Sequence, residues 1–154
     1  MEFTLRPIAK DNWEEAIQLK VKEEQTDFIA SNLYSIAEVQ FLDQFTACGI
    51  YAAEQMVGFT MFGVDTDDDN YWIYRLMIDQ EHQGKGYGSA AVKLVVEEIK
   101  RMNTSGIPLI MIGYDRENEG ARDRFAVNRR KAVKRKGNFR QVCVQPEKSC
   151  QKKG

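Results

Sequence analysis

Hydrophobic residues recur along the chain in two spacings, and each spacing predicts one kind of element. Runs rich in branched and aromatic residues, with partial alternation, predict β-strands. These runs are Phe3–Ile8, Ile50–Ala53, Met56–Val64, Tyr71–Ile78 and Ile107–Tyr114. Because the second and third runs are separated only by Glu54 and Gln55, they are expected to form a hairpin.

Helical spacing occurs at three places. Between residues 11 and 42, Asp11 with Glu14 and Ser35 with Glu38 form capping-box patterns, so two helices are expected there. A third helix is expected after the last of three closely spaced glycines, with a buried face made of Ala91, Val92, Val95 and Ile99. The resulting order is strand, two helices, three strands, helix and strand, which is an α/β (α+β) arrangement.

The strand Tyr71–Ile78 leads through Asp79–His82 into a glycine-rich turn, Gln83–Gly88, at the start of the third helix. The first amides of a helix lack carbonyl partners, and the helix dipole adds partial positive charge there. Glycine also lets a phosphate approach the backbone closely, because it has no β-carbon. The turn therefore predicts an anion site, and a diphosphate is the ligand we expect.

Two common diphosphate motifs do not match this turn. A Walker A loop requires G-x-x-x-x-G-K-[ST], which is absent from the sequence. A dinucleotide-binding fingerprint requires G-x-G-x-x-G, whereas Gly84, Gly86 and Gly88 are spaced G-x-G-x-G, and no acid is well placed after the next strand. The turn does match Q/R-x-x-G-x-G/A, with Gln83 at the first position.

Together with the strand before it and the apolar helix after it, this motif resembles the acetyl-CoA-binding segment of the GCN5-related N-acetyltransferases (GNATs). The resemblance covers residues 1 to about 125. It implies a mixed, mostly antiparallel sheet flanked by helices, in the order β-α-α-β-β-β-α-β-α-β, within a single N-acetyltransferase domain over residues 1–154. It also implies acetyl-CoA as co-substrate, bound in a V-shaped cleft where the strand Tyr71–Ile78 splays from its neighbour.

Carried over residue by residue, the resemblance implies a cofactor site. In the family, backbone groups of the splayed strand bind the pantetheine arm, the turn amides take the diphosphate, and an asparagine often begins the helix after the next strand. The corresponding residues here are Leu76, Met77, Ile78, Gln83, Gly84, Lys85, Gly86, Tyr87, Gly88 and Asn118. A plain helix N-cap is the alternative interpretation of Asn118.

Acetyl transfer to an amine needs a base, an oxyanion donor and a proton for the leaving thiolate. A backbone amide at Met77 or Ile78 is the expected oxyanion donor, because a bulge would free an N–H there. His82 titrates near neutrality, but a histidine at this position is commonplace and non-catalytic in the family. The candidate bases are Glu23, Glu24, and Tyr74 acting through a water.

The proton donor to the thiolate is where the chain departs from the family pattern. The family usually has N-x-x-A-x-x-L-Y, whose tyrosine donates to sulfur. Asn118 and Ala121 match, but Phe125 stands at the tyrosine position. Tyr114 could substitute, or solvent could protonate the thiolate, since a thiol has a pKa of only about 8.5. A catalytically silent acetyl-CoA-binding protein is therefore a rival hypothesis.

The segment from about residue 126 is unlike a family C-terminus, and Arg129 and Arg130 replace the usual glycine and phenylalanine. Its pattern predicts a helix to Lys136, a stop at Gly137 and a short strand Phe139–Val144, with no room for a final hairpin strand. A divergent tail and an out-of-frame tail both fit this pattern. In the second case a partner chain or an exposed sheet edge must compensate, so a homodimer is one expectation.

The segment Leu19–Ser35 resembles the corresponding stretch of bacterial spermine/spermidine acetyltransferases. The matching positions are Gln25, Phe28, Ile29, Ala30, Asn32 and Ser35, and Arg75 matches in the later strand. The resemblance implies that this segment flanks the acceptor mouth, where Glu23, Glu24 and Asp27 would hold a second ammonium of a polyamine and Phe28 would contribute to the substrate site. Another small amine, such as an aminoglycoside, is the alternative acceptor.

Charge divides the chain unevenly. Residues 1–114 contain 9 Lys and Arg against 18 Asp and Glu, a net charge of −9, whereas residues 115–154 contain 13 against 5, a net charge of +8. The acidic body suits a small cationic amine substrate through its summed field. The basic end suits nucleic acid, but no aromatic platform or reading motif accompanies it, so no nucleic-acid partner is expected.

The remaining composition points to a cytoplasmic protein without metal. Cys48, Cys143 and Cys150 are odd in number and lack C-x-x-C spacing, and with the single histidine they do not form a zinc set. The acidic run at residues 65–70 lacks the glycine and glutamate of an EF-hand loop. No stretch reaches the roughly 18 apolar residues of a membrane helix, and no leader is evident, so no membrane association is expected.

Overall fold

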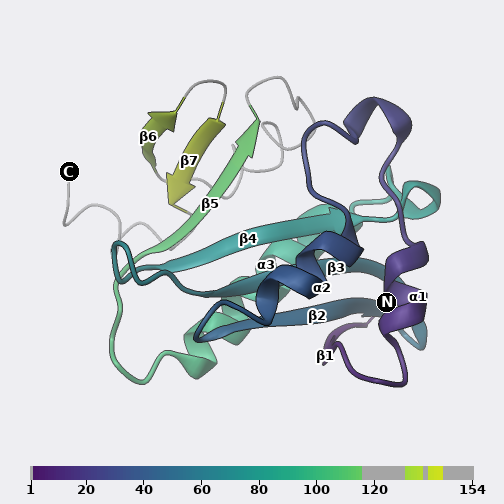
Figure 1. The fold of residues 1–154 in the computed structure, drawn as a ribbon, viewed down its shortest axis with the longest axis horizontal. Coiled ribbons are helices and arrows are strands. Elements are labelled where there is room, and N and C mark those ends of the chain that lie inside the picture. Colours follow the sequence, from purple (N-terminus) through teal and green to yellow (C-terminus); the bar gives the residue numbers. More distant parts are fainter. Residues whose placement is uncertain (1, 116–130, 137–138, 144–154) are drawn as a thin grey trace.

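The computed structural model describes residues 2–115, 131–136 and 139–143. Its elements in chain order are β1 (Phe3–Pro7), α1 (Trp13–Gln18), the 3₁₀ helix η1 (Glu23–Gln25), α2 (Asn32–Val39), β2 (Phe45–Ala52), β3 (Gln55–Val64), β4 (Tyr71–Ile78), the 3₁₀ helix η2 (Gln80–His82), α3 (Tyr87–Met102), β5 (Ile110–Asp115), β6 (Lys131–Lys136) and β7 (Phe139–Cys143). The strands form one sheet in the order β1-β2-β3-β4-β5-β7-β6 (Figure 1).

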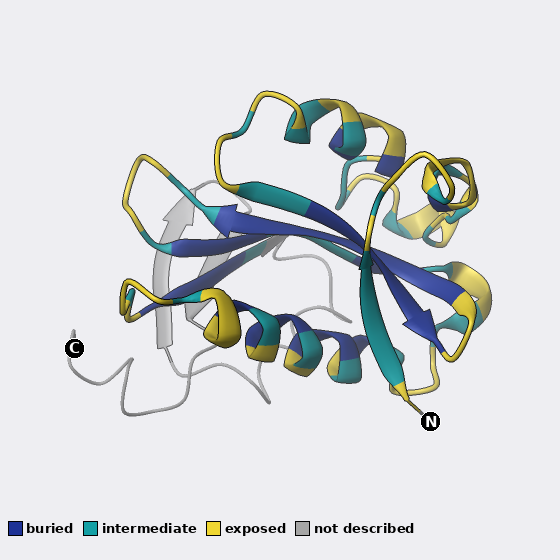
Figure 2. Ribbon diagram, turned by 90° about the horizontal axis from the view of Figure 1, so that it is seen from below, coloured by how far each residue is buried: buried dark blue, intermediate teal, exposed yellow. Residues whose placement is uncertain are grey.

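The sheet is mixed and mostly antiparallel, as expected. Its one parallel pair among the described strands is β4 with β5. A parallel pair requires a crossover connection, and α3 supplies it. The helix Tyr87–Met102 packs on one face of the sheet, while α1 and α2 cover the other (Figure 2).

Apolar side chains fill both spaces between the layers. On the α3 face, Val92, Val95 and Ile99 meet the inward side chains of the central strands, among them Phe62 and Ile73. On the opposite face, a cluster beneath α1 and α2 includes Ala16, Phe59, Met61 and Met77, the first three of them fully buried. The central strands are therefore buried on both faces, and ligands can reach their backbone only at a strand end or where two strands part.

The two N-terminal helices begin at caps other than the predicted ones. Helix α1 starts after Asn12, whose side chain instead accepts from Ala9 N at 2.7 Å and donates to Pro7 O at 3.0 Å. Helix α2 starts after Ser31, whose hydroxyl accepts from Tyr34 N at 3.1 Å. Ser35 is buried within the helix. Several adjacent residues can serve as caps, and packing of the buried helix faces selects among them.

The predicted C-terminal helix ending at Lys136 is wrong for residues 131–136, which form strand β6. β6 pairs antiparallel with β7, and β7 pairs antiparallel with β5, so a hairpin does extend the sheet. The short strand at Phe139 is confirmed and ends at Cys143. Unpaired backbone groups along the edge of β5 favour strand addition, and this pairing overrides the helix preference of a Lys- and Arg-rich sequence.

Candidate active site

Strands β4 and β5 pair over only three residues and then separate. Their register runs from Tyr71 opposite Ile110 to Ile73 opposite Ile112, although β4 continues to Ile78. Figure 1 shows β5 rising away from β4 beyond this point. Among the described residues, no strand pairs with the second half of β4 on this side. The splaying of β4 from its neighbour, which the family resemblance implies, is therefore present among the described residues.

A β-bulge lies where the two strands part. In the β3–β4 ladder Met61 is opposite Arg75 and Phe62 is opposite Ile73, so Tyr74 has no counterpart on β3. A bulge can place two successive side chains on one face of a sheet. Tyr74 packs with the cluster beneath α1 and α2, and Arg75 reaches Glu38 of α2, so both side chains lie on that face. A bulge was expected at Met77 or Ile78, whereas the structure has it at Tyr74, three residues before Met77.

Hydrogen bonds on the β3 side fix which amides of β4 face the opening. Thr60 Oγ1 donates to Arg75 O at 2.8 Å, so this carbonyl points toward β3. No peptide bond among the described residues is cis, so Leu76 N–H, on the same planar unit, points the opposite way. Asp79 N donates to Val57 O at 2.8 Å, and alternation along the strand then turns Met77 N–H toward β3 and Ile78 N–H away. Leu76 and Ile78 thus present their amides to the opening.

The glycine-rich turn follows η2 and opens helix α3. Gly84 has φ of 79° and Gly86, the N-cap of α3, has φ of 81°, values that side-chain-bearing residues rarely adopt. A β-carbon added at either glycine would meet nothing within 4 Å, so the backbone here is open to an approaching group. Helix geometry leaves the amides of Gly88 and Ser89 without carbonyl partners inside the helix. These features together suit an anion.

Gln83 joins this turn to two other segments. Its Nε2 donates to Ile78 O at 2.9 Å and to Gln25 Oε1 at 2.9 Å. Gln25 lies in η1, so one side chain connects the end of β4, the turn and the segment between α1 and α2. The side-chain amide is thereby committed within the protein, and the role we expect for Gln83 is to shape the turn while its backbone faces the ligand.

The other residues singled out from the sequence lie at the glycine-rich turn, in β5 or outside the described residues. Lys85 is exposed, with its Nζ 5.8 Å from the centre of the Tyr87 ring, and Tyr87 packs edge-on against Phe3 at 5.0 Å. His82 stacks parallel to Tyr87 at 6.3 Å. Tyr114 belongs to β5, but the structure describes only its backbone. Asn118, Ala121, Phe125, Arg129 and Arg130 lie outside the described residues.

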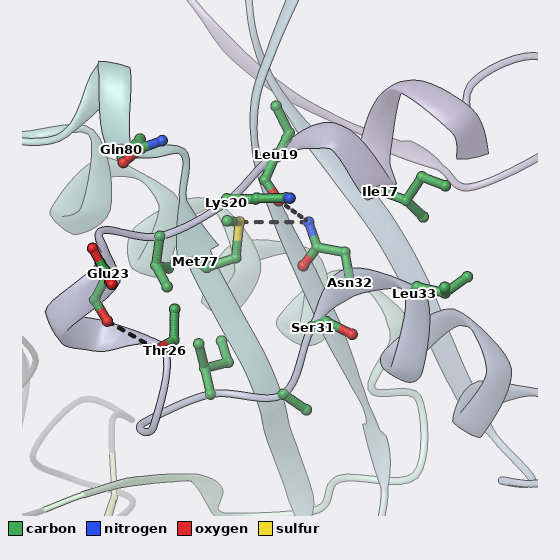
Figure 3. A pocket seen from close by; sticks show the side chains of 13 residues that line it. Ile17, Leu19, Lys20, Glu23, Thr26, Ser31, Asn32, Leu33, Met77 and Gln80 are labelled. Carbon is green, nitrogen blue, oxygen red and sulfur yellow. Dashed lines mark hydrogen bonds between the residues drawn. The ribbon is translucent and has the colours of Figure 1, made fainter.

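A pocket of about 510 Å³ lies on the α1/α2 face, next to the amide-presenting half of β4 (Figure 3). Met77 and Asn32 form part of its wall. Asn32 is 5% exposed, and its Nδ2 donates to Ala16 O at 2.8 Å and to Met77 Sδ at 3.7 Å. Asn32 therefore ties α1, α2 and β4 together at the pocket wall, and the pocket has the position expected for an acceptor site.

The predicted acidic residues are not equally close to this pocket. Glu23 lines it, as does Lys20. Glu24 and Asp27 are exposed and do not line it, and neither does Phe28, which is half-buried. These acids lie in or next to η1 rather than on the first helix, which ends at Gln18. The pocket lining thus includes one acidic side chain, Glu23, and one basic side chain, Lys20.

Tyr74, the third candidate base, holds its proton firmly. Its hydroxyl donates a short hydrogen bond to Asp65 Oδ2, and its ring packs at 4.4 Å against Phe45. Burial raises the pKa of Tyr74 well above its usual value, and the hydrogen bond and charge of Asp65 raise it further. A phenol in this setting is a poor base near neutral pH. The acidic turn at residues 65–70 thus anchors aromatic side chains, since Asp68 also accepts from Trp72 Nε1 at 2.8 Å.

Arg75 and Glu38 form an ion pair that the sequence pattern did not single out. Arg75 Nη2 donates to Glu38 Oε1 at 2.8 Å, and the two side chains are 16% and 30% exposed. Arg75 Nη1 donates to Tyr74 O at 3.2 Å. A lone arginine within an otherwise apolar strand was the available signal, but its partner could be identified only from the packing of α2 on β4. The pair fixes the bulge from the α2 face.

No group of three or more His, Cys, Asp or Glu side chains among the described residues is arranged to hold a metal ion. None of the helices in this part of the chain is both long and apolar enough to cross a membrane.

Comparison with known proteins relates this geometry to a family. The model of the acetyltransferase (GNAT) family matches residues 5–126. A spermine/spermidine N(1)-acetyltransferase of Bacillus subtilis (strain 168) is 26% identical over 108 residues, which are 66% of this chain and 71% of that protein.

Two solved structures, both in complex with coenzyme A, have the same fold. The PaiA N-acetyltransferase of Thermoplasma acidophilum has a TM-score of 0.67 at 18% identity, covering 95% of this chain and 100% of that one. Aminoglycoside acetyltransferase AAC(6')-Ib has a TM-score of 0.74 at 14% identity, covering 98% of each chain. Taken with the family match over most of the chain, the splayed strands and the glycine-rich turn, these findings make the chain a member of the GNAT family and an acetyl-CoA-dependent acyltransferase.

Proposed function

We propose that this protein transfers the acetyl group of acetyl-CoA to a primary amine of a small cationic substrate, and that the substrate is a polyamine of the spermidine or spermine type. The observation that carries the proposal is the pair of amides, Leu76 and Ile78, which face the opening between β4 and β5. They lie one short turn away from the anion-suited glycines at the start of α3. A phosphorylated thioester can span these two features.

In this proposal the turn Gln83–Gly88 binds the diphosphate through its backbone amides. The backbone of β4 then binds the pantetheine arm, with Ile78 N–H as one contact. Leu76 N–H, nearer the bulge, meets the thioester oxygen and stabilises the oxyanion. From the sequence, the amide of Met77 or Ile78 is the expected oxyanion donor. The alternation of the strand favours Leu76 and Ile78, because the amide of Met77 is turned toward β3.

The acceptor would approach from the α1/α2 face, through the pocket bounded by Asn32 and Met77. Its neutral nitrogen attacks the thioester carbon, its proton passes to a base, and the CoA thiolate leaves and takes a proton. Glu23 is the carboxylate that lines this pocket, so we assign it, acting through water, as the base. Tyr114 or solvent is the proposed proton source for the thiolate.

Three observations support a polyamine over other amines. The similarity to the spermine/spermidine acetyltransferase of Bacillus subtilis covers 66% of this chain. Residues 1–114 have a net charge of −9, which attracts polycations. Glu24 and Asp27 are exposed next to the pocket-lining Glu23, so a long substrate leaving the pocket would meet further carboxylates. Lys20 at the pocket favours a substrate whose entering end is uncharged when it reacts.

The test is a panel of amines assayed for thiol release from acetyl-CoA: spermidine, spermine, putrescine, a monoamine and kanamycin. Spermidine and spermine are expected to have a kcat/KM at least tenfold above the monoamine and kanamycin, and mass spectrometry should find one added acetyl group on the amine. Equal or higher efficiency with kanamycin would exclude the polyamine assignment while leaving acetyl transfer intact.

A second candidate function, a silent acetyl-CoA-binding protein, is motivated by Phe125 at the position of the usual tyrosine. The same assay distinguishes it when combined with calorimetry of CoA binding. Micromolar binding of CoA without thiol release from any amine would favour the silent protein. Introducing the family residue by Phe125→Tyr is the informative variant, because a gain of turnover would show that only the proton donor is missing.

A further inference from the structure

Thr60 is a polar residue at the centre of the apolar strand β3, and it is fully buried. Burying a hydroxyl is costly unless it is hydrogen-bonded. Its bond goes to the backbone carbonyl of Arg75, at 2.8 Å. A valine would have the same shape here and would avoid the cost of burying the hydroxyl. The hydroxyl is therefore expected to have a use connected with the peptide unit that it binds.

That peptide unit also carries the amide of Leu76. The carbonyl of Arg75 and the N–H of Leu76 belong to one planar trans group, so they point in opposite directions. The hydroxyl of Thr60 holds one end of this rigid group, and the other end faces the opening between β4 and β5. Any tilt of the plane at the carbonyl turns the N–H by the same angle.

The bulge makes this restraint necessary. Because Tyr74 has no counterpart on β3, the ladder is interrupted immediately before Arg75. Side-chain donors serve both carbonyls at the interruption: Arg75 Nη1 donates to Tyr74 O at 3.2 Å, and Thr60 Oγ1 donates to Arg75 O. The second bond acts directly on the peptide unit of Leu76. Hydrogen bonds weaken steeply as they bend, so a loosened plane would weaken a bond made by Leu76 N–H.

We propose that Thr60 is a positioning residue for acetyl transfer: its hydroxyl holds the Arg75–Leu76 peptide unit so that Leu76 N–H is aimed at the thioester oxygen. This inference rests on the proposed function, in which that amide stabilises the oxyanion. Thr60 does not touch the acetyl group, because its side chain lies on the β3 side of the strand. Its effect is therefore on kcat, with little effect on the binding of CoA through the glycine-rich turn.

The experiment compares Thr60→Val, which removes the hydroxyl, with Thr60→Ser, which keeps it. Thr4→Val is the matched control, because Thr4 Oγ1 is also buried but has no hydrogen-bond partner. Thr60→Val is expected to lower kcat by about 10–100-fold, since misplacing a catalytic donor has effects of this order. The Kd for CoA should change by less than about twofold, and Thr60→Ser should recover kcat to within about threefold of wild type. Thr4→Val should leave kcat unchanged.

Two results would overturn the inference: a kcat for Thr60→Val equal to that of Thr4→Val, or a Thr60→Ser enzyme as slow as Thr60→Val with CoA binding intact. If the Thr60→Val protein does not fold, a measurement on the wild-type protein tests the position of Leu76 N–H, on which the inference depends. Replacing CoA by acetyl-CoA should move the NMR amide signal of Leu76 more than that of Met77, and an unmoved Leu76 signal contradicts the inference. Absence of turnover in wild type with every amine, or an unmoved Leu76 signal, counts against the proposed function, whereas an unchanged kcat for Thr60→Val in a protein whose wild type turns over counts against the inference alone.

Discussion

Tyr74 illustrates how a side chain beside the proposed site can be poorly suited to act as a base. Its hydroxyl is held by Asp65, and burial with that contact raises its pKa well above the usual value. Among the titratable groups of β4 it has the most altered pKa, which often marks a catalytic residue. Here the direction of the shift argues otherwise, because a base must give up its proton near neutral pH.

Tyr74→Phe is therefore expected to reduce kcat less than about threefold, while lowering the free energy of unfolding by about 1–2 kcal/mol because Asp65 loses a donor. Urea denaturation and thiol-release kinetics on the same preparation measure both. A hundredfold loss of kcat with unchanged stability would instead place Tyr74 in the proton pathway.

Cys48 gives a prediction for the pH dependence of stability. Burial raises the pKa of its thiol from the ordinary 9.0 to about 11. The folded state therefore favours the neutral thiol, and the stability that this preference contributes is fully present below pH 9 and lost as the pH rises from about 9 through 11. Cys48→Ala lacks this contribution, so the wild-type protein should lose up to roughly 2–3 kcal/mol relative to the variant over that interval. Parallel stability curves for the two proteins between pH 8 and 11 would contradict the assignment.

At the scale of elements, the junction of β4, the glycine-rich turn and α3 is where we propose that the cofactor binds. The left-handed φ of Gly86 makes a substitution by alanine costly wherever the residue sits. Gly106 also has a left-handed φ, 71°, and open space around it, but it follows α3 at the far end. Replacing either glycine by alanine should therefore affect stability similarly, but only Gly86 lies in the glycine-rich turn.

Gly86→Ala and Gly106→Ala should each lower stability by about 1 kcal/mol. Only Gly86→Ala should weaken CoA binding, by about tenfold or more, because a β-carbon would enter the space that the diphosphate needs. Calorimetry with CoA separates the two variants. Equal weakening by both would mean that the turn has no special part in binding.

Helix α2 is tied to the bulge of β4 by Arg75 and Glu38. Glu38→Gln should lower the free energy of unfolding by about 1–2 kcal/mol, less than for a fully buried pair because Glu38 is 30% exposed. A double-mutant cycle with Arg75→Gln should give a coupling of similar size. Glu54→Gln is the control, since its ion pair with Arg6 is exposed, at 88% for the glutamate. If the Glu38→Gln protein is as stable as the Glu54→Gln protein, the ion pair between Arg75 and Glu38 does not stabilise the bulge.

At the scale of the whole molecule, the charge of residues 1–114 is available to attract a cationic substrate. We expect kcat/KM for spermidine to fall by about five- to tenfold between 20 and 200 mM salt, because screening shortens the range of the field. A monoamine should show less than about a twofold change. If both amines respond alike, the acidic body serves solubility and does not steer the substrate.

Local pattern was enough to predict the strand and helix on either side of the proposed cofactor site. The bounds of β4 are those expected, and α3 begins within the predicted glycine-rich turn, because strand and turn are specified by neighbouring residues. What the sequence left open depends on partners far along the chain. The cap of α1 was misplaced because Asn12 bonds to Pro7 of β1 and to Ala9, and β6 was missed because it pairs with β7.

The site shows the same division. Gln83, Gly84 and Gly86 could be proposed from spacing alone. Proposing Leu76 in place of Met77 as the oxyanion donor required the register of β3 against β4, and so did the proposed role of Thr60. Glu38 could be identified as the partner of Arg75 only from the packing of α2 on the bulge. Asn118 and Phe125 stay predictions, because they lie outside the described residues.

The position of bound acetyl-CoA is the central claim, and a crystal structure of the complex with acetyl-CoA tests it directly. We expect diphosphate oxygens about 2.7–3.2 Å from backbone nitrogens between Gln83 and Gly88, and the thioester oxygen at a similar distance from Leu76 N. A complex in which the diphosphate lies away from this turn, or in which the thioester lies on the β3 side of β4, would contradict it.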